Sequence, residues 1–325
     1  MRTINTLMAA TALTAAGTVA VTAETWDLPL AYPATNFHSV NAAEFGACVS
    51  GATGGAIDVV THPNGSLFAG NDIKRAVQTG QAPIGERLIS AHQNENPMFG
   101  IDSIPFLATS FEDHERLWEA AGPAVAEILD AQNLVYLYSV AWPPQGLYFK
   151  REINSVADMD GIRFRSYNTA TARLAELTNM RPVQIEAAEL SQALATGVAE
   201  SFISSGATGY DSQVWESLTH FYEVDAWLPR NIVFVNKQAW EGLDEDARIA
   251  MLDCAAEAKA AGLEKAREFT GRTLDGLREN GMIVQRASEE LMDGLREVGA
   301  TMTDEWLETA GDTGRAVIEA YRGSN

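Results

Sequence analysis

Short apolar strands alternate with helical segments through the first ninety residues, and this order constrains the fold more than any other feature. Residues 25–32 alternate between apolar and polar side chains as a strand does, whereas residues 36–49 have helical spacing. The series continues with strands expected at 56–60 and 84–89 and a helix at 73–78. A β-α-β-α-β order favours a mainly parallel sheet flanked by helices, which assigns the chain to the α/β class.

A second strand–helix series follows a long predicted helix at 110–132, whose start carries a capping signal at Ser110. Strands are expected again from residue 134 onward, and the chain is mostly helical from residue 244. No repeat or flexible linker separates the two series. Together with the usual size of domains, this predicts two α/β lobes with several chain crossings between them.

The first 23 residues have the pattern of a secretory signal peptide. Arg2 supplies the positive charge, residues 7–21 are apolar and rich in alanine, and Val21-Thr22-Ala23 is a small-residue cleavage site. The apolar stretch is short for a membrane anchor, and no other segment has the roughly 20 unbroken apolar residues of a membrane span. We expect export to the periplasm, cleavage after about Ala23 and no direct membrane insertion.

The chain is strongly acidic, with a formal net charge of −21 and a pI near 4.5. A surface of this charge repels nucleic acid and anionic lipid, so we expect no nucleic-acid partner. It also repels an anionic ligand at long range. An anion site in this protein must therefore be built from a few local cations.

The two cysteines, Cys48 and Cys254, are far apart in the sequence. An exported chain meets an oxidising compartment, where a disulfide can form. The sequence does not show whether their Cα atoms come within bonding range, so the pairing stays open. Neither cysteine has the nearby histidines of a zinc site.

The motifs of several common enzyme classes are missing from the sequence. It has no Gly-x-Ser-x-Gly elbow, no Walker loop and no His-Glu-x-x-His. The histidines are scattered without the short spacing of metal ligands, at His38, His62, His92, His114 and His220. We therefore favour a binding protein without cofactor or metal over an enzyme.

Arg163 and Arg165 are two residues apart on an expected strand, so their side chains point to opposite faces. One of them can be solvated while the other faces a cleft. A buried arginine is costly unless an anion pairs with it. Its planar guanidinium suits a carboxylate, through two parallel hydrogen bonds. That carboxylate can belong to a ligand or to an acidic side chain of the protein, and spacing alone leaves both interpretations open.

Six segments are informative through their order and spacing. They are Thr53-Gly-Gly-Ala-Ile-Asp-Val, His62-Pro-Asn-Gly-Ser-Leu, Ile104-Pro-Phe-Leu, Ser155-Val-Ala-Asp-Met-Asp-Gly-Ile-Arg-Phe-Arg, Glu189-Leu-Ser-Gln-Ala-Leu-Ala-Thr-Gly-Val-Ala-Glu and Val235-Asn-Lys-Gln-Ala-Trp. In this order the chain resembles the solute receptors of TRAP transporters, the DctP-like family, over nearly its whole mature length.

The resemblance implies a two-lobed periplasmic binding protein fold, with a ligand cleft between the lobes, crossing strands and a long connecting helix. We place lobe I at residues 24–145 and 230–270, and lobe II at residues 146–229 and 271–325. The resemblance also implies that the bound solute is delivered to a TRAP membrane permease that is driven by an ion gradient.

In the family, the second arginine of a Gly-x-Lys/Arg-x-Arg strand pairs with the substrate carboxylate, and here that position is Arg165. Many members carry another arginine on the preceding strand, where this chain has Tyr148. Ser204 stands where a ligand-binding asparagine is common, and Ile203 replaces a glutamate of the members that bind a metal. The resemblance thus implies one main cation, no metal and a ligand with one carboxylate.

The same resemblance places further residues at or near the cleft. They are Asn36, Phe37, Phe68, Glu86, Arg87, Trp142, Asn168, Ser205 and Trp227. If Arg87 faces the cleft, a ligand with a second acidic group becomes possible.

The sequence therefore predicts a receptor for a small organic monocarboxylate with an aromatic or apolar body. Arg165 is expected to hold the carboxylate, with help from Tyr148 and from Ser204 or Ser205. Two alternatives remain open. One is the same receptor role for a zwitterion such as ectoine, a dicarboxylate or a keto acid. The other is a periplasmic α/β enzyme, which the missing catalytic motifs disfavour.

Overall fold

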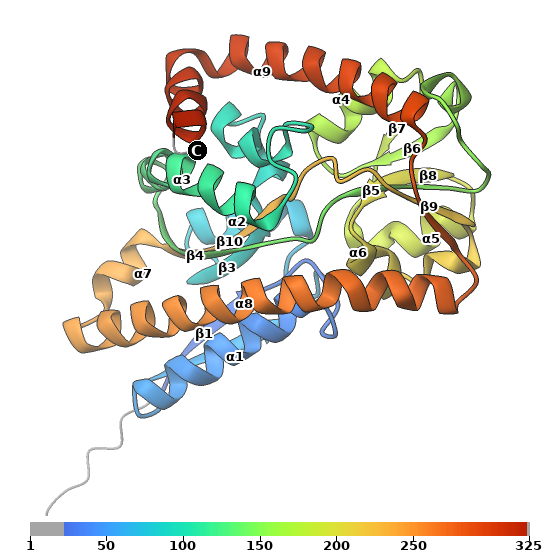
Figure 1. Cartoon of the computed structure of the whole chain (residues 1–325). Coiled ribbons are helices and arrows are strands. Elements are labelled where there is room, and N and C mark those ends of the chain that lie inside the picture. The colour runs from blue at the N-terminus through green and yellow to red at the C-terminus, as the bar shows by residue number, and fades with distance from the viewer. Residues whose placement is uncertain (1–22, 324–325) are drawn as a thin grey trace, which may run out of the picture.

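The computed structural model describes residues 23–323, which form two α/β lobes (Figure 1). Lobe I contains a parallel pair, β1 (Glu24–Pro29) and β2 (Ile57–His62), and a three-stranded sheet in the order β3 (Ile84–Leu88), β10 (Arg230–Asn236), β4 (Leu134–Ala141). Lobe II contains a six-stranded sheet in the order β11 (Ile283–Arg286), β9 (His220–Glu223), β5 (Gly146–Phe149), β8 (Ser201–Ser204), β6 (Arg163–Ser166), β7 (Arg181–Gln184). The two α/β lobes expected from the sequence are thus present.

The six-stranded sheet is mixed and the three-stranded sheet is antiparallel, so the expectation of a mainly parallel sheet is wrong for part of the fold. In lobe I, β10 runs antiparallel to both β3 and β4. In lobe II, β5 runs antiparallel to β8 and β9, whereas the other strand pairs are parallel. The strands β5 and β10 are those that enter each lobe directly from the other one. Their direction is therefore set by the chain crossings and not by a local β-α-β unit.

Two chain crossings lie side by side between the lobes. Residues 142–145 lead from β4 into β5, and residues 224–229 lead from β9 back into β10. The backbone N–H of Trp142 donates to the carbonyl of Pro229 at 2.8 Å, and that of Gln145 donates to the carbonyl of Trp227 at 2.9 Å. These hydrogen bonds join the crossings into one double connection, which is the kind of short segment about which lobes rotate.

The helix α8 (Glu245–Glu279) spans both lobes (Figure 1). It begins at Asp244, whose side chain accepts a hydrogen bond from the backbone N–H of Ala247 at 2.8 Å. It packs on α1 (Phe37–Ala52) and β4 in lobe I, and on α6 (Gly206–Asp211) and β11 in lobe II. This helix matches the long connecting helix that the sequence resemblance implies.

The C-terminal helix α9 (Glu289–Gly323) also contacts both lobes. It packs against α4 (Thr169–Leu177) in lobe II, and its backbone breaks at Gly311, where φ is 60° and ψ is −143°. Beyond the break the helix bends toward α3 (Phe111–Ala131) in lobe I, where the Tyr321 hydroxyl donates to the Leu107 carbonyl at 3.2 Å (Figure 1). The predicted lobe boundaries, with residues 271–325 in lobe II, therefore remain a proposal.

Shorter helices complete the two lobes. They are α2 (Ile73–Gln78), α5 (Leu190–Ala195), α7 (Lys237–Gly242) and the 3₁₀ segments Gly70–Asp72, Ile89–His92, Pro97–Ser103, Val156–Met159, Ala187–Glu189 and Val214–Glu216. At the start of α3, the Ser110 side chain accepts a hydrogen bond from the Asp113 N–H at 3.1 Å. The capping signal predicted at Ser110 is thereby confirmed.

Residues 1–22, which hold nearly all of the predicted signal peptide, lie outside the described residues. Among residues 23–323, no helix combines the length and the apolar character that a membrane span requires.

Cys48 and Cys254 form a disulfide between α1 and α8, with their Cα atoms 5.8 Å apart. The sequence left this pairing open, and the packing of α1 against α8 decides it. The bond closes a loop of 206 residues, which strongly restricts the unfolded chain.

We predict that replacing both cysteines, as in Cys48→Ser/Cys254→Ser, lowers the free energy of unfolding by about 2–5 kcal/mol, because the unfolded chain regains this loop entropy. Urea unfolding at equilibrium measures the change. Wild-type protein in a reducing agent should unfold at the same urea concentration as the double variant, whose own midpoint should not respond to the reductant. Equal midpoints for oxidised and reduced wild type would contradict the prediction.

Candidate functional site

A pocket lies where the two lobes and both chain crossings meet, with a volume of about 30 Å³. Its walls come from both lobes and are mainly aromatic, charged or small polar side chains. They are Tyr32, Arg87, Leu88, Trp142, Gln145, Arg165, Tyr167, Glu186, Ala187, Ser204, Thr208 and Pro229. We call it the Arg165 pocket. It contains four of the twelve residues predicted from the sequence, namely Arg87, Trp142, Arg165 and Ser204.

Arg165 lies on β6 and is 3% exposed. Its Nε donates to the Ile185 carbonyl at 2.9 Å, and its guanidinium lies 5.1 Å from the centre of the Tyr167 ring. No carboxylate of residues 23–323 lies within ion-pair distance of this guanidinium, and its two terminal nitrogens donate to no described group. Burial lowers the Arg165 pKa to about 10, so the side chain is still charged at neutral pH. A buried charge without a protein partner is the arrangement expected of an anion-binding site.

Arg163 confirms the strand alternation predicted from the sequence. Its side chain is 49% exposed on the opposite face of β6 and pairs with Glu200 at 2.9 Å. The two arginines of the same strand therefore differ in role, since one is satisfied at the surface and the other faces the pocket.

Arg87, on β3 in lobe I, brings a second guanidinium to the pocket, but this one is paired. Its Nη2 donates to Asn71 Oδ1 at 2.6 Å and lies 3.4 Å from Glu186 Oε2 in lobe II. Its Nε is buried and has no hydrogen-bond partner among the described residues. Glu186 was not among the predicted residues, although it follows the carboxyl end of β7, where ligand contacts are common in α/β sheets.

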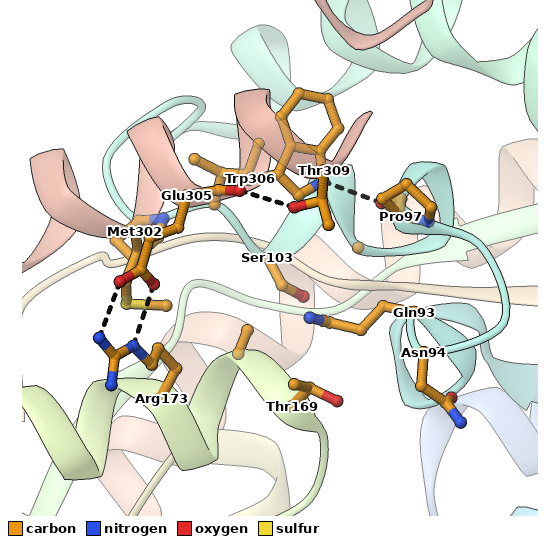
Figure 2. Close-up of a pocket in the computed structure, with 14 residues that line it drawn as sticks. Gln93, Asn94, Pro97, Ser103, Thr169, Arg173, Met302, Glu305, Trp306 and Thr309 are labelled. Atoms are coloured by element: carbon orange, nitrogen blue, oxygen red, sulfur yellow. Dashed lines mark hydrogen bonds and ion pairs between the residues drawn. The ribbon is translucent and has the colours of Figure 1, made fainter. Parts of the chain in front are cut away.

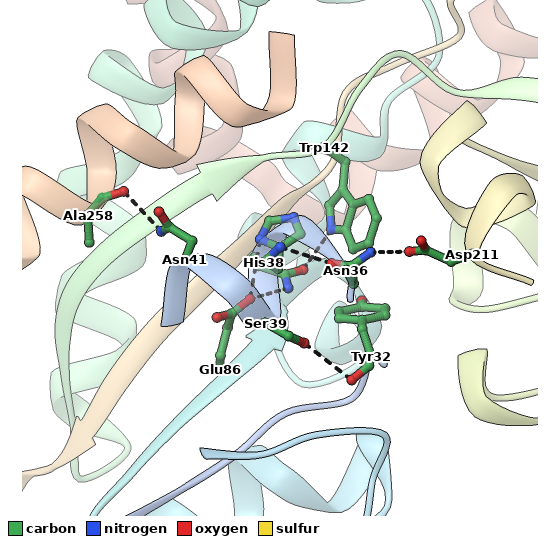
Figure 3. A network of polar contacts seen from close by, with 10 residues as sticks. Tyr32, Asn36, His38, Ser39, Asn41, Glu86, Trp142, Asp211 and Ala258 are labelled. Carbon is green, nitrogen blue, oxygen red and sulfur yellow. Dashed lines mark hydrogen bonds and ion pairs between the residues drawn. The ribbon is translucent and has the colours of Figure 1, made fainter. Parts of the chain in front are cut away.

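Glu86 does not reach the pocket, which corrects the prediction for this residue. Because it neighbours Arg87 on a strand, its side chain points to the opposite face. There it lies 3.3 Å from His38 Nδ1 (Figure 3). It also accepts a hydrogen bond from Asn231 Nδ2 at 2.7 Å. Trp142 Nε1 donates to Asn231 Oδ1 at 2.8 Å, so this buried network fixes the indole that lines the pocket. Burial lowers the His38 pKa, which keeps the imidazole neutral.

Asn36 and Phe37 also lie away from the pocket walls. Asn36 caps α1 by accepting from the His38 N–H at 2.9 Å, and its Nδ2 donates to Asp211 Oδ2 in lobe II at 2.7 Å (Figure 3). Phe37 is fully buried, with its ring 5.2 Å from the Trp142 ring. Phe37 packs against a wall residue, whereas Asn36 joins the two lobes, and the prediction of direct ligand contact is corrected for both.

Tyr148 is the largest correction to the predicted site. Its side chain is fully buried in the core of lobe II and stacks on Phe202 with ring centres 4.3 Å apart. Its hydroxyl donates to the Ser205 carbonyl at 2.9 Å. The family pattern showed that Tyr148 stands where relatives carry an arginine. It did not show on which face of β5 the tyrosine side chain lies. Tyr148 therefore acts on the site only through the backbone next to Ser204.

Four other predicted residues have structural contacts of their own. Ser205 Oγ caps α6 by accepting from the Thr208 N–H at 3.3 Å. Trp227 Nε1 donates to the Tyr167 hydroxyl at 3.2 Å, which holds a wall residue in place. Asn168 caps α4, and its Nδ2 donates to Ser90 Oγ of lobe I at 3.0 Å. Phe68 is half-buried against the lobe I core and is not a wall residue of the pocket.

Several wall residues were missed from the sequence, namely Tyr32, Gln145, Tyr167 and Glu186. Tyr167 follows Arg165 by two residues and so lies on the same face of the chain, a signal that strand alternation already contains. Its hydroxyl donates to Gln145 Oε1 at 3.3 Å. No sequence pattern indicated that Tyr32 lines the pocket. It belongs to lobe I and lies near Arg165 of lobe II only because the two lobes face each other across the pocket.

A larger cavity of about 380 Å³ lies between α9, α4 and the segment 93–105 (Figure 2). Its charged groups are already satisfied. Arg173 donates to both carboxylate oxygens of Glu305, at 3.0 and 2.7 Å, and also pairs with Glu176 at 2.9 Å. Trp306 Nε1 donates to the Pro97 carbonyl at 2.8 Å. Because no charge is left for an anion, this cavity is less suited to a carboxylate than the Arg165 pocket.

Within residues 23–323, no group of three histidine, cysteine, aspartate or glutamate side chains is placed to hold a metal ion.

Comparison with known families identifies the protein's class. Residues 31–309 match the family model DctP, described as bacterial extracellular solute-binding protein, family 7. The chain belongs to the DctP family. Its members in the comparisons are solute-binding receptors of TRAP transporters and not enzymes, which confirms the class and the two-lobed fold predicted from the sequence.

Two solved structures of DctP-type receptors are especially similar. A TRAP solute-binding protein from a marine metagenome, described as specific for pyroglutamate and holding co-purified pyroglutamate, has 53% identity and a TM-score of 0.92, and the match covers 93% of this chain and 99% of that one. A Bordetella pertussis receptor that binds pyroglutamic acid has 43% identity and a TM-score of 0.91, over 92% and 100% of the two chains.

A more distant DctP relative is the C4-dicarboxylate-binding periplasmic protein of Rhodobacter capsulatus. It is 25% identical over 293 residues, which cover 86% of this chain and 85% of that protein. The family therefore includes receptors for ligands of different charge, so the family alone does not fix the ligand of this DctP protein.

The correction for Tyr148 generates a prediction. Tyr148→Phe should lower the free energy of unfolding by about 1 kcal/mol, because a buried hydrogen bond is lost and the Ser205 carbonyl keeps only the longer one from the Gly209 N–H. Ligand affinity should stay within about twofold of wild type, a difference of only a few tenths of a kcal/mol. Urea unfolding and titration calorimetry measure the two quantities. A large loss of affinity with unchanged stability would mean that the hydroxyl contacts the ligand after all.

Proposed function

We propose that this DctP protein is a periplasmic receptor for pyroglutamate or a closely related small monocarboxylate, and that Arg165 binds the carboxylate. The observation that supports this most directly is the buried Arg165 guanidinium, whose terminal nitrogens have no partner among the described residues. The relatives with 53% and 43% identity that bind pyroglutamate support the ligand.

The wall residues of the pocket suit a compact ligand with one carboxylate. The planar guanidinium can donate two parallel hydrogen bonds to a carboxylate, and the Ile185 carbonyl fixes its orientation through Nε. Tyr32, Trp142 and Tyr167 offer aromatic surface to the ligand body, and Ser204 offers a hydroxyl. Pyroglutamate has one carboxylate on a small five-membered lactam ring, which fits this mixture of one free cation, aromatic surface and hydrogen-bonding groups.

We also propose how the bound solute reaches the cell. The lobes close over the ligand by rotation about the double connection at 142–145 and 224–229, and contacts made only in the closed state stabilise it. The closed receptor then docks on a TRAP permease, which receives the solute. Export through a signal peptide cleaved after about Ala23 is part of the same proposal.

The ligand is tested by titrating purified protein with pyroglutamate, after refolding to remove any bound solute. We expect micromolar or tighter binding, which is about −8 kcal/mol or better. A matching rise in the melting temperature is expected, because a ligand that binds only the folded state stabilises it. No heat and no thermal shift with millimolar pyroglutamate would overturn this ligand.

The role of Arg165 is tested with a matched pair of variants. Arg165→Ala should lose about 2–5 kcal/mol of binding free energy, because it removes a buried charge partner of the carboxylate. Arg163→Ala removes an arginine from the same strand, but its side chain faces the solvent and pairs with Glu200, so ligand affinity should not change. Calorimetry on both variants, with circular dichroism as a check of folding, separates the two. Wild-type affinity in Arg165→Ala would exclude the assignment.

A further inference from the structure

Glu186 reaches across the cleft to a cation of the other lobe. It follows β7 in lobe II, and its carboxylate lies 3.4 Å from Nη2 of Arg87 on β3 in lobe I. Both side chains are walls of the Arg165 pocket. Arg87 is 3% exposed, so its charge is poorly screened by solvent and strongly influenced by this carboxylate.

A glycine in lobe I makes room for this contact. A Cβ atom on Gly70 would lie 2.6 Å from Glu186 Oε2 and 2.9 Å from Arg87 Nη1. Both distances are too short for real side chains, so Glu186 can approach Arg87 in this way because residue 70 has no side chain. The backbone of lobe I is thus shaped around the ion pair.

The charges on the pocket walls can be counted. Arg87 and Arg165 each carry one positive charge, and Glu186 carries one negative charge. Tyr32 and Tyr167 stay neutral, because burial raises the Tyr32 pKa to about 12 and also raises the Tyr167 pKa. The pocket walls therefore present one net positive charge, and it is located at Arg165, since Arg87 is paired.

The pairing leaves Arg87 able to make a neutral contact. Its Nη2 is held by Asn71 and Glu186, whereas its Nη1 donates to no described group. A free donor of this kind can be satisfied by an uncharged oxygen, such as a lactam or amide carbonyl. A second carboxylate of a ligand, in contrast, would meet the Glu186 carboxylate close by.

We propose that Glu186 is a specificity-determining residue, which restricts the receptor to ligands with a single negative charge by neutralising Arg87 across the cleft. The favoured ligand class is a monocarboxylate that also carries a neutral hydrogen-bonding oxygen. This inference rests on the proposed role of Arg165 in carboxylate binding, and it extends that proposal to the charge of the rest of the ligand.

The test compares glutarate with its monoamide, glutaramate, because the two have nearly the same shape and differ by one negative charge. Wild type should prefer the monoamide. In Glu186→Gln the side chain keeps its size but loses its charge, so Arg87 becomes available to the second carboxylate. We expect the ratio of glutarate to glutaramate affinity to rise about tenfold or more, which corresponds to about 1.4 kcal/mol.

Glu189→Gln is the matched control. Glu189 lies three residues further along the chain, at the end of the 3₁₀ segment Ala187–Glu189, is exposed and is not a wall residue of the pocket. The control removes one charge from the same region and should leave the affinity ratio unchanged. A merely structural role of Glu186 would weaken both ligands together and would not move the ratio.

The outcomes separate this inference from the proposed ligand. If wild type fails to bind pyroglutamate, the ligand proposal falls, while the glutarate ratio still tests the charge rule. If the ratio in Glu186→Gln stays within about twofold of wild type, a difference near 0.4 kcal/mol, the inference on Glu186 is overturned even when pyroglutamate binds. Failure of glutarate to bind or stabilise Glu186→Gln at millimolar concentration also overturns it.

Discussion

The buried guanidinium of Arg165 is the interaction on which the arrangement of the cleft depends. It is nearly inaccessible to solvent, yet among the described residues its nearest fixed partners are the Ile185 carbonyl and the face of Tyr167, which orient the charge without neutralising it. Burial of an unpaired charge costs several kcal/mol. The protein holds this charge on β6 of lobe II, at the wall of the pocket between the lobes, where an anion from solution can compensate it.

The other charges near the cleft are arranged so that they do not compete with Arg165. Arg87 is held by Asn71 and Glu186, Arg163 by Glu200, and Arg173 by Glu305 and Glu176. This explains how a chain with a net charge of −21 can bind an anion. The long-range field is repulsive and is screened within about 10 Å at ordinary salt. Arg165, in contrast, attracts an anion at contact distance, and its charge is buried and therefore little screened by solvent.

Two residues that cap helices also join the two lobes. Asn36 caps α1 and donates across the cleft to Asp211, while Asn168 caps α4 and donates across it to Ser90. Each asparagine has an oxygen for the cap and an amide group for the opposite lobe. The starts of α1 and α4 therefore lie where the lobes meet.

The sequence by itself determined the features that depend on neighbours along the chain. Strand alternation separated Arg163 from Arg165, the capping signal located the start of α3, and the ordered motifs gave the family and the two-lobed fold. The alternation of side chains along a strand also predicted that Arg163 and Arg165 lie on opposite faces. Tyr148 and Glu86 were misplaced because the family pattern gave their positions along the chain and not the direction of their side chains.

Only the tertiary structure decided which distant residues meet. The Cys48–Cys254 disulfide joins residues 206 positions apart, and the Arg87–Glu186 pair joins residues 99 positions apart in different lobes. Such contacts depend on the path of the chain through both crossings and on the packing of α1 against α8. Local periodicity contains no record of that path, because it reports only the side of each strand or helix that faces the interior.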